Sequence, residues 1–492
     1  MDILVFVVVV VFFSYAILSI FGFGKPMNLP PGPTPLPIIG NLHLLGRQPH
    51  RSLAKLAHTH GPVMLLKLGQ NTTLVISSIA AAKEVLQKQD LAFSSTRHIP
   101  DSLTIHNFSK HSLGFLPIGT RWRFLRRILN TNIFSGKSLE ASQHLRDQKV
   151  QELIDYCNKA CLSNDYVDIG HVAFTTSLSL LSNTIFSKDL TCPYEDSTND
   201  FREVVGNIME EAGKPNLVDF FPVLKVFDPQ GIRRRMTRHV GKVLSILEEL
   251  IEERFAMGGS KKDDVLEMCL RINQDNPEEL SKSLIKFLIL DMFIAGTHTL
   301  SSTVEWAMAE LLRNPHIMAK SKEELEQVVG KGKIIKEHDF LRLPYLSSIV
   351  KETFRLHPPA PLLLPRKAEN QVKLNGYIIP KGTQVLVNAW AIGQDPIIWE
   401  DSKEFKPERF LDCQIDVRGQ DFELIPFGAG RRICPGMPLA LSTIHMMLGS
   451  LPNNFDWKLD SNVHPKELDM TERFGITLQI ANPISVVPIP LM

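Results

Sequence analysis

A single cysteine, Cys434, stands in a loop where it could act as a metal ligand. The stretch "FELIPFGAGRRICPGMPLAL", residues 422–441, offers no second cysteine or nearby histidine that could share a metal or act as a base. Pro435 precedes an apolar helical pattern, which predicts a helix N-terminus that favours the thiolate form of Cys434. Two interpretations compete. Cys434 is either a packed structural residue or the ligand of a large anionic cofactor, with Phe427 over one face and Arg432 on a carboxylate.

The spacing of Phe427, Gly430, Arg432, Cys434 and Gly436 resembles the FxxGxRxCxG haem-binding loop of the cytochrome P-450 family. The resemblance implies haem b (iron protoporphyrin IX), with Cys434 as the ligand of the iron. A thiolate in that position favours O–O cleavage. It also implies a monooxygenase that uses O2 and takes NADPH electrons from a cytochrome P-450 reductase.

A second motif of this family is structural. Glu352 and Arg355 in "KETFRLHPP" match its ExxR pattern, three residues apart on one helical face, and Arg409 lies in "FKPERF". An exposed pair at this spacing contributes only about 0.5 kcal/mol, so the order of all three motifs along the chain carries the weight. The resemblance implies a Glu–Arg–Arg network that stabilises the core and does no chemistry.

The catalytic candidates lie on a long apolar segment, Leu284 to Arg313, that contains no proline and predicts about 45 Å of helix. Its "AGTHTL" resembles the family pattern [AG]Gx[DE]T[TS], which implies that Thr299 delivers protons to bound oxygen. His298 replaces the acid and Leu300 replaces the second hydroxyl. Because a histidine cannot reproduce the charge of a carboxylate, we hypothesise slower or less well coupled turnover.

Basic side chains are expected at the haem carboxylates. Trp122 and Arg126 match a WxxxR spacing, and Arg366 in "LLLPRKA" and Arg432 complete the set that the resemblance implies. A further group of arginines could form a basic face for an acidic reductase, or could simply be solvated: Arg121, Arg123, Arg127 and Arg431.

Short sequence segments along the chain, such as "EEAGKPNLVDFFP" and "DPQGIRRRMTRH", resemble those of the plant microsomal branch around the geraniol 8-hydroxylases. The resemblance implies a hydrophobic substrate such as a monoterpenol; another terpenoid, an alkaloid or a phenolic is the alternative. It implies an apolar pocket lined by Phe293, Ile294, Ala295, Leu362, Leu363, Phe474 and Ile476.

The N-terminus predicts a membrane anchor. Residues 3–24 contain no charge, and this uncharged segment is long enough to span a bilayer as a helix. Basic residues follow the span, which favours a cytosolic body. A cleaved signal peptide is less consistent because Asp2 replaces the usual basic start. We therefore expect an anchor at 1–24, a proline-rich hinge at 25–49, a haem domain at 50–492, and a single-pass protein of the endoplasmic reticulum membrane.

The remaining pattern predicts a mainly α fold with small β-sheets, as in the cytochrome P-450 fold. Helical periodicity covers 149–160, 240–255, 284–313, 316–329, 346–356 and 438–451, and strand patterns are short. Pro452 should kink or end the last helix. A formal net charge of +1 argues against a nucleic-acid partner.

Three classes of function remain open from the sequence. The first is an NADPH-dependent monooxygenase, favoured by Thr299 and the basic face. The second is a haem-thiolate isomerase or dehydratase that needs no reductase, which His298 would allow. The third is a haem-binding protein with little activity.

Overall fold

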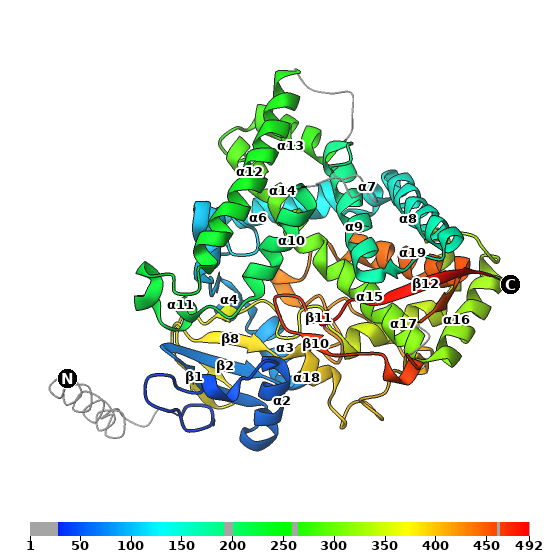
Figure 1. The fold of residues 1–492 in the computed structure, drawn as a ribbon. Coiled ribbons are helices and arrows are strands. Elements are labelled where there is room, and N and C mark those ends of the chain that lie inside the picture. Colours follow the sequence, from blue (N-terminus) through cyan, green and yellow to red (C-terminus); the bar gives the residue numbers. More distant parts are fainter. Residues whose placement is uncertain (1–27, 191–199, 258–263, 460–462, 492) are drawn as a thin grey trace, which may run out of the picture.

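The structure is a computed structural model that describes residues 28–190, 200–257, 264–459 and 463–491. The expected anchor at residues 1–24 lies outside these ranges, as do Cys192 and most of the loop at 257–264. In the described part, helices form most of the molecule and small sheets complete it (Figure 1). The prediction of a mainly α fold with small sheets is confirmed.

The longer helices cover the predicted periodic segments, although several of them, among them the helix at residues 169–186, were not predicted from the periodicity. They are α2 (Pro49–His60), α6 (Thr120–Ile128), α8 (Gln143–Ser163), α9 (Ile169–Phe186), α10 (Asp200–Gly213), α12 (Ile232–Ala256), α13 (Val265–Asp275), α14 (Lys282–Gly296), α15 (His298–Arg313), α16 (Pro315–Val328), α17 (Pro344–Leu356) and α19 (Met437–Asn454). Short helical turns that matter for the site are η2 (Glu84–Lys88), α4 (Asp90–Ser94), α5 (Phe108–His111), α11 (Leu217–Phe220), η6 (Pro222–Val226), η8 (Pro407–Phe410) and η9 (Gly430–Arg432).

The largest sheet has the order β1-β2-β8-β5-β3. Its strands are β1 (Val63–Leu68), β2 (Asn71–Ile76), β8 (Gln384–Val387), β5 (Arg366–Lys367) and β3 (Thr96–Arg97). The other strands are β4 (Val167–Asp168), β12 (Ser485–Pro490) and β9 (Phe455–Lys458) in one sheet, β6 (Val372–Leu374) with β7 (Tyr377–Ile379), and β10 (Glu472–Arg473) with β11 (Gln479–Ile480). In the register of β3 with β5, Arg97 lies directly opposite Arg366.

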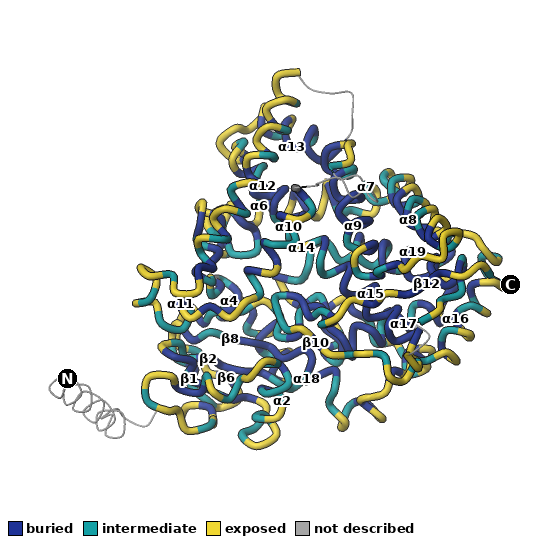
Figure 2. Tube along the Cα trace, viewed as in Figure 1, coloured by how far each residue is buried: buried dark blue, intermediate teal, exposed yellow. Residues whose placement is uncertain are grey.

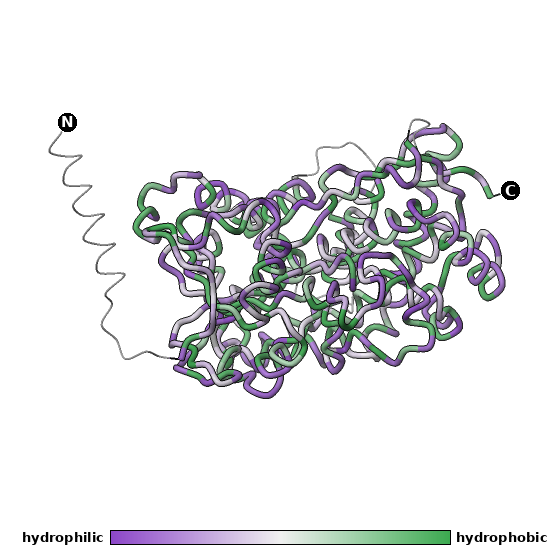
Figure 3. The backbone as a smooth tube through the Cα atoms, turned by 90° about the horizontal axis from the view of Figure 1, so that it is seen from below, coloured by the Kyte–Doolittle hydropathy of each residue, from purple (hydrophilic) through white to green (hydrophobic). Residues whose placement is uncertain are grey.

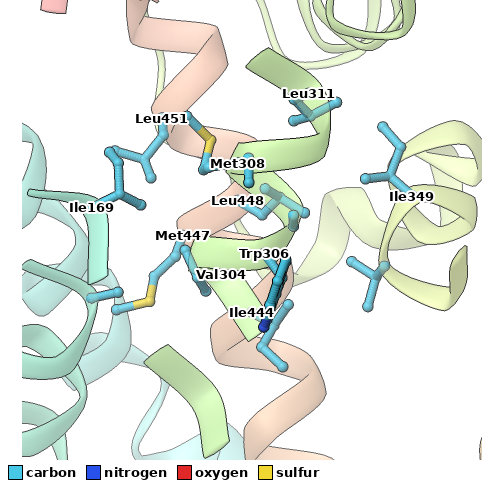
Figure 4. Close-up of a cluster of buried hydrophobic side chains, with 14 of the residues drawn as sticks. Ile169, Val304, Trp306, Met308, Leu311, Ile349, Ile444, Met447, Leu448 and Leu451 are labelled. Carbon is cyan, nitrogen blue, oxygen red and sulfur yellow. The ribbon is translucent and has the colours of Figure 1, made fainter. Parts of the chain in front are cut away.

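The core surrounds α15, which is buried on nearly every face (Figure 2). Figure 4 shows Val304, Met308 and Leu311 of α15 beside residues of α19 and α17. A second cluster of buried residues joins α9, α10, α12 and α14. Because neighbouring helices enclose α14 and α15 on most sides, their positions are well determined by packing.

The predicted long helix is interrupted at one residue. α14 ends at Gly296 and α15 begins at His298, with Thr297 at φ −90° and ψ −65° between them. Hydroxyl groups beside the break donate to carbonyls one turn back, from Thr297 to Phe293 at 2.9 Å and from Thr299 to Ala295 at 2.8 Å. Such bonds compete with the backbone ladder and bend helices.

The helix after Cys434 covers the predicted segment 438–451 but does not include Pro435 in its first turn. α19 starts at Met437 with Pro438 in its first turn, so Pro435 lies outside the helix rather than at its start. Proline suits that first turn because its missing N–H would have no helical partner there. Pro452 lies inside the helix, which ends two residues later at Asn454, consistent with the prediction that this proline terminates it.

The proline-rich segment packs on the sheet instead of standing free. The N–H of Leu65 donates to the carbonyl of Pro31 at 2.8 Å, and the N–H of Asn41 donates to that of Lys67 at 2.6 Å. A Cβ atom at Gly32 would lie 2.0 Å from the carbonyl oxygen of Leu65, so this close approach requires glycine. The described part of the expected hinge is therefore attached along β1.

Within the described ranges, one helical stretch, Lys282–Arg313, has the length and apolar character of a membrane span. Of its most apolar window, 56% is buried inside the protein, as in a core helix.

Candidate functional site

Cys434 lies in the short loop between η9 and α19. Its N–H donates to the carbonyl of Phe427 at 3.0 Å, and the ring of Phe427 packs edge-on against Phe354 at 5.2 Å. Gly430 has φ +70°, and a Cβ atom there would lie 2.0 Å from the carbonyl oxygen of Leu86. Glycine at this position therefore lets the loop turn tightly against η2 and present the sulfur at a defined place.

Burial raises the pKa of Cys434 above its ordinary value. The N–H groups of Gly436 and Met437 donate to the sulfur, and they and Arg126 act in the opposite direction, but burial is the larger effect. The expected contribution of the N–H groups at the helix N-terminus to the thiolate is therefore present, but burial outweighs it in the protein chain by itself. A bound metal cation would reverse the balance, because a coordinating thiol is deprotonated.

The buried cysteines Cys157 and Cys269 lack such donors. Burial raises the pKa of Cys157 and that of Cys269 to about 12, and no hydrogen bond counteracts it. No group of three or more His, Cys, Asp or Glu side chains that could hold a metal ion occurs in the part of the chain that the structure describes. A metal at Cys434 would therefore need a cofactor to supply its other ligands.

A guanidinium cluster, formed by Arg97, Arg366 and Arg432, lies next to this loop. Arg366 donates to Asp90 at 2.8 Å, and Arg432 donates to the carbonyls of Ser94 at 2.7 Å and Leu116 at 2.6 Å. All three arginines are buried, and among the described residues Asp90 is the only carboxylate that forms an ion pair with any of them.

The electrostatics of the guanidinium cluster are unfavourable for the chain alone. Burial and, to a smaller extent, the charge of Arg366 lower the pKa of Arg432 to about 10. Burial also lowers the pKa of Arg97, and its buried Nε has no hydrogen-bond partner. Like charges opposite each other in a sheet are destabilising, as at Arg97 and Arg366. These features fit a cofactor that carries two carboxylates, such as haem b.

Trp122 and Arg126, which were also predicted at the haem carboxylates, both lie near Arg432. Trp122 is buried, and the guanidinium carbon of Arg432 lies 5.4 Å from the centre of its ring. Arg126 is within electrostatic reach of Cys434 and Arg432. Sequence reasoning missed Arg97, which stands in "FSSTRH"; only the pairing of β3 with β5 brings it to the site.

The predicted Glu–Arg–Arg network forms completely. Arg355 donates two hydrogen bonds to Glu352, at 2.7 and 2.8 Å, and Arg409 donates a third at 3.0 Å. Arg355 also donates to the carbonyls of Gly393 and Ser402 at 2.6 and 2.7 Å. Both Glu352 and Arg355 are buried, so this Glu352 network, Glu352 with Arg355 and Arg409, belongs to the interior.

The two catalytic candidates flank the helix break in different surroundings. Thr299 is partly exposed, on the same helical face as the exposed Ala295. His298 packs against Phe174 with ring centres 4.7 Å apart, and its Nδ1 accepts a hydrogen bond from the side-chain amide of Gln479 at 2.8 Å. Burial lowers the pKa of His298 to about 4, so the ring is neutral at physiological pH.

The predicted pocket residues are not all open. Ile294, Leu362, Leu363, Phe474 and Ile476 are partly exposed, and Ala295 is exposed although it lies midway along the Lys282–Arg313 stretch. Phe293 is different, because it is fully buried between Phe186 and Phe201, at 6.3 and 5.0 Å between ring centres. Its position on α14 directs the ring into the second core cluster instead of toward an open surface.

Comparison with known proteins agrees with these features. A family model described as cytochrome P-450 matches residues 30–486. The chain is 64% identical over 491 residues to a 7-ethoxycoumarin O-deethylase of Helianthus tuberosus, and the match covers 100% of both chains. It is 60% identical over 466 residues to a geraniol 8-hydroxylase of Catharanthus roseus (94% of each chain) and 52% identical over 472 residues to a geranylhydroquinone 3''-hydroxylase of Arnebia euchroma (95% of each). From the thiolate loop, the Glu352 network and this full-length similarity, we conclude that the chain belongs to the cytochrome P-450 family and is one of its monooxygenases.

Proposed function

We propose that the chain binds haem b with Cys434 on the iron and the two haem carboxylates among Arg97, Arg366 and Arg432. The observation that supports this most strongly is the surplus of buried positive charge in the guanidinium cluster, where one carboxylate faces three arginines. A thiolate-ligated haem supplies the activation of O2. The chain supplies the anion-binding cluster, the sulfur and the surrounding packing.

We assign proton delivery to Thr299 at the helix break. Its hydroxyl donates to the carbonyl of Ala295 and stays partly exposed, so it can accept a further hydrogen bond. His298 is the proposed substitute for the acid of related enzymes. Because its pKa lies near 4, the imidazole ring is uncharged at neutral pH, so it can relay a proton but does not store one.

A coupling measurement tests the role of His298. His298→Asp restores the acid, and it should raise the product formed per NADPH consumed by a factor of about two or more. Thr299→Ala should lower the same ratio. Unchanged coupling in His298→Asp would count against the proposed effect of the histidine.

The proposed substrate is a monoterpenol such as geraniol, hydroxylated with one oxygen atom of O2 while the other leaves as water and NADPH supplies two electrons. The relatives named as geraniol 8-hydroxylases support this choice. The partly exposed expected pocket residues are mainly apolar, and an apolar pocket discriminates one methylene by only about 1–3 kcal/mol. The 64% identical relative supports a second substrate class, aryl ethers. Hydroxylation of the carbon next to the ether oxygen would release an aldehyde and a phenol.

The substrate experiment uses membranes that contain the full chain and a cytochrome P-450 reductase. Geraniol and 7-ethoxycoumarin are each incubated with and without NADPH, and the products are identified. A hydroxylated geraniol that requires NADPH supports the proposal. A rearranged or dehydrated product formed without NADPH would instead support a reductase-independent isomerase or dehydratase.

We propose that the reductase docks on the exposed face of α6. Arg121, Arg123 and Arg127 are exposed there, and none of them forms an ion pair with another described residue. Unpaired basic side chains beside the cofactor site attract an acidic partner and speed its association.

We also propose that the N-terminal 24 residues anchor the chain in the endoplasmic reticulum membrane with the body in the cytosol. Support comes from exposed apolar side chains at two neighbouring segments. Val223, Val226 and Phe227 are 71%, 88% and 75% exposed, and Ile38 is 59% exposed. Both segments meet the β1–β2 turn, where Gly69 donates to Ile39 and Gln70 donates to Phe220. Figure 1 labels α11 at the left edge of the described body, and Figure 3, turned about the horizontal axis, shows hydrophobic stretches along the left edge.

A carbonate wash tests the anchor. The full chain should stay with the membrane, whereas a chain without residues 1–27 should be released. Retention of the shortened chain would instead assign membrane attachment to the apolar surface around Phe227.

A further inference from the structure

One face of α14 changes from covered to open along its length. Phe287, Asp291, Ala295 and Thr299 follow one another at intervals of four residues and so share a face. Phe287 is buried, stacked on His111 of α5 at 4.8 Å. Asp291 is partly exposed, Ala295 is exposed and Thr299 is partly exposed. Asp291 therefore stands where the cover given by α5 ends and the open face begins.

The carboxyl group of Asp291 binds the loop that follows α5, at Ser112 and Leu113. Its Oδ2 accepts the N–H of Leu113 at 2.7 Å, and the hydroxyl of Ser112 donates to the same carboxyl group. Asp291 forms no ion pair with any residue in the described ranges. A carboxyl group has about four acceptor positions, so two hydrogen bonds leave it capacity for a further partner.

The surroundings make this group unusual. Burial raises the pKa of Asp291 to about 7, so near neutral pH the group is present both as acceptor and as donor. The other residues on this face of α14 and α15 are Phe287, Ala295 and Thr299, none of which carries a charge. A single polar group among apolar neighbours sets the orientation of a ligand.

We propose that Asp291 is a specificity-determining residue, whose carboxyl group binds the hydroxyl group of an alcohol or phenol substrate and orients the apolar remainder along α14 toward Thr299. This inference rests on the proposed monooxygenation of hydrophobic alcohols. Asp291 and Thr299 are separated by roughly 12 Å along the helix axis. An extended monoterpenol held by its hydroxyl group at Asp291 would therefore present its remote end near Thr299.

The test compares two ligands that differ in whether their oxygen atom carries a hydrogen atom or a methyl group. Dissociation constants of the holoenzyme are measured for geraniol and for geranyl methyl ether from the change in the haem absorption spectrum. In the unmodified enzyme geraniol should bind about tenfold more tightly than the ether, because only the alcohol can donate to the carboxyl group. In Asp291→Asn the preference should fall to about threefold or less.

Ser112→Ala is the matched control, since it weakens the same loop contact and keeps the carboxyl group. It should leave the geraniol preference unchanged. If Asp291→Asn and Ser112→Ala alter both ligands by the same factor, or if the unmodified enzyme shows no preference, Asp291 only fastens the loop and the inference is wrong.

A different result would concern the substrate class. If the unmodified enzyme binds neither geraniol nor its ether, the monoterpenol proposal fails, and the pair 7-hydroxycoumarin and 7-ethoxycoumarin decides the inference on Asp291 by the same ratio. A variant with a changed spectrum before ligand addition is replaced by Asp291→Glu, which keeps the carboxyl group displaced by one methylene and should shift the position of hydroxylation.

Discussion

Two groups of arginines inside the protein differ in how completely their polar groups are paired. In the Glu352 network, two arginines share one carboxylate, and the remaining N–H groups find backbone carbonyls such as those of Gly393 and Ser402. In the guanidinium cluster, Arg97 and Arg366 lie opposite each other, and Arg97 keeps an unpaired Nε. The first group is complete within the chain, whereas the second is complete only with an added anion. The difference separates residues that hold the fold from residues that hold a ligand.

The largest expected effect is in the Glu352 network. Glu352→Gln removes the shared charge and leaves the buried Arg355 and the partly buried Arg409 without a carboxylate, so we expect the free energy of unfolding to fall by about 3–5 kcal/mol. Urea unfolding of the detergent-solubilised protein measures this.

Glu408→Gln is the control, because Glu408 is half exposed and pairs with Lys320 at the surface. It should cost less than about 1 kcal/mol. Equal losses in the two variants would mean that the Glu352 network has no special place in the core.

Substitutions in the guanidinium cluster should change the retention of haem more than the stability of the fold. Arg97→Leu removes one unpaired charge, so it should speed the transfer of haem to a scavenger protein by about 10- to 100-fold, because a charged hydrogen bond to a haem carboxylate is lost. Arg409→Leu should change the stability of the fold with a much smaller effect on the rate of haem transfer. If Arg97→Leu transfers haem at the original rate, the cluster is not the site of the haem carboxylates.

His298 has one ring nitrogen with a hydrogen-bond partner and one without. Nδ1 is paired with Gln479, whose amide oxygen accepts from Arg473 at 2.7 Å, while the buried Nε2 has no partner. Because the pKa is lowered to about 4 in the folded protein, the unfolded chain binds more protons between pH 4 and 6.5. The folded protein should therefore lose stability as the pH falls through this window, by about 1–2 kcal/mol, and should be unaffected by His298 above pH 7.

Unfolding curves of the unmodified protein and of His298→Gln at pH 5 and 7.5 measure this. The variant should show a smaller loss on acidification. Identical pH dependence would indicate that the ring is not held neutral by its surroundings.

The smallest expected effect lies on the surface. Arg127→Glu should raise the reductase concentration needed for half-maximal turnover a few-fold and weaken its dependence on salt, because the proposed contact is electrostatic and solvent-exposed. Lys458→Glu, an exposed charge on β9, is the matched control. Equal behaviour of the two variants would exclude α6 as the docking face.

The sequence predicted the parts of the site that lie within short motifs. Glu352 and Arg355 share one helical turn, and the residues around Cys434 form one loop, so local spacing was enough to find them. Arg97 and Asp90 were missed because a two-residue strand pair and a short helix bring them to the site, and neither has a recognisable period. α9 was missed for another reason. Its buried face carries hydroxyl side chains, among them Thr175 and Ser179, that conceal the apolar repeat.

The most direct test of the whole account is the spectrum of the reduced protein with carbon monoxide. The unmodified chain and Cys413→Ala, which changes a partly exposed cysteine outside the loop, should both give the band of a thiolate-ligated haem. Cys434→Ala should abolish this band. A thiolate band that survives in Cys434→Ala, or one that is absent from the correctly folded unmodified protein, would contradict the central claim that this sulfur binds the iron.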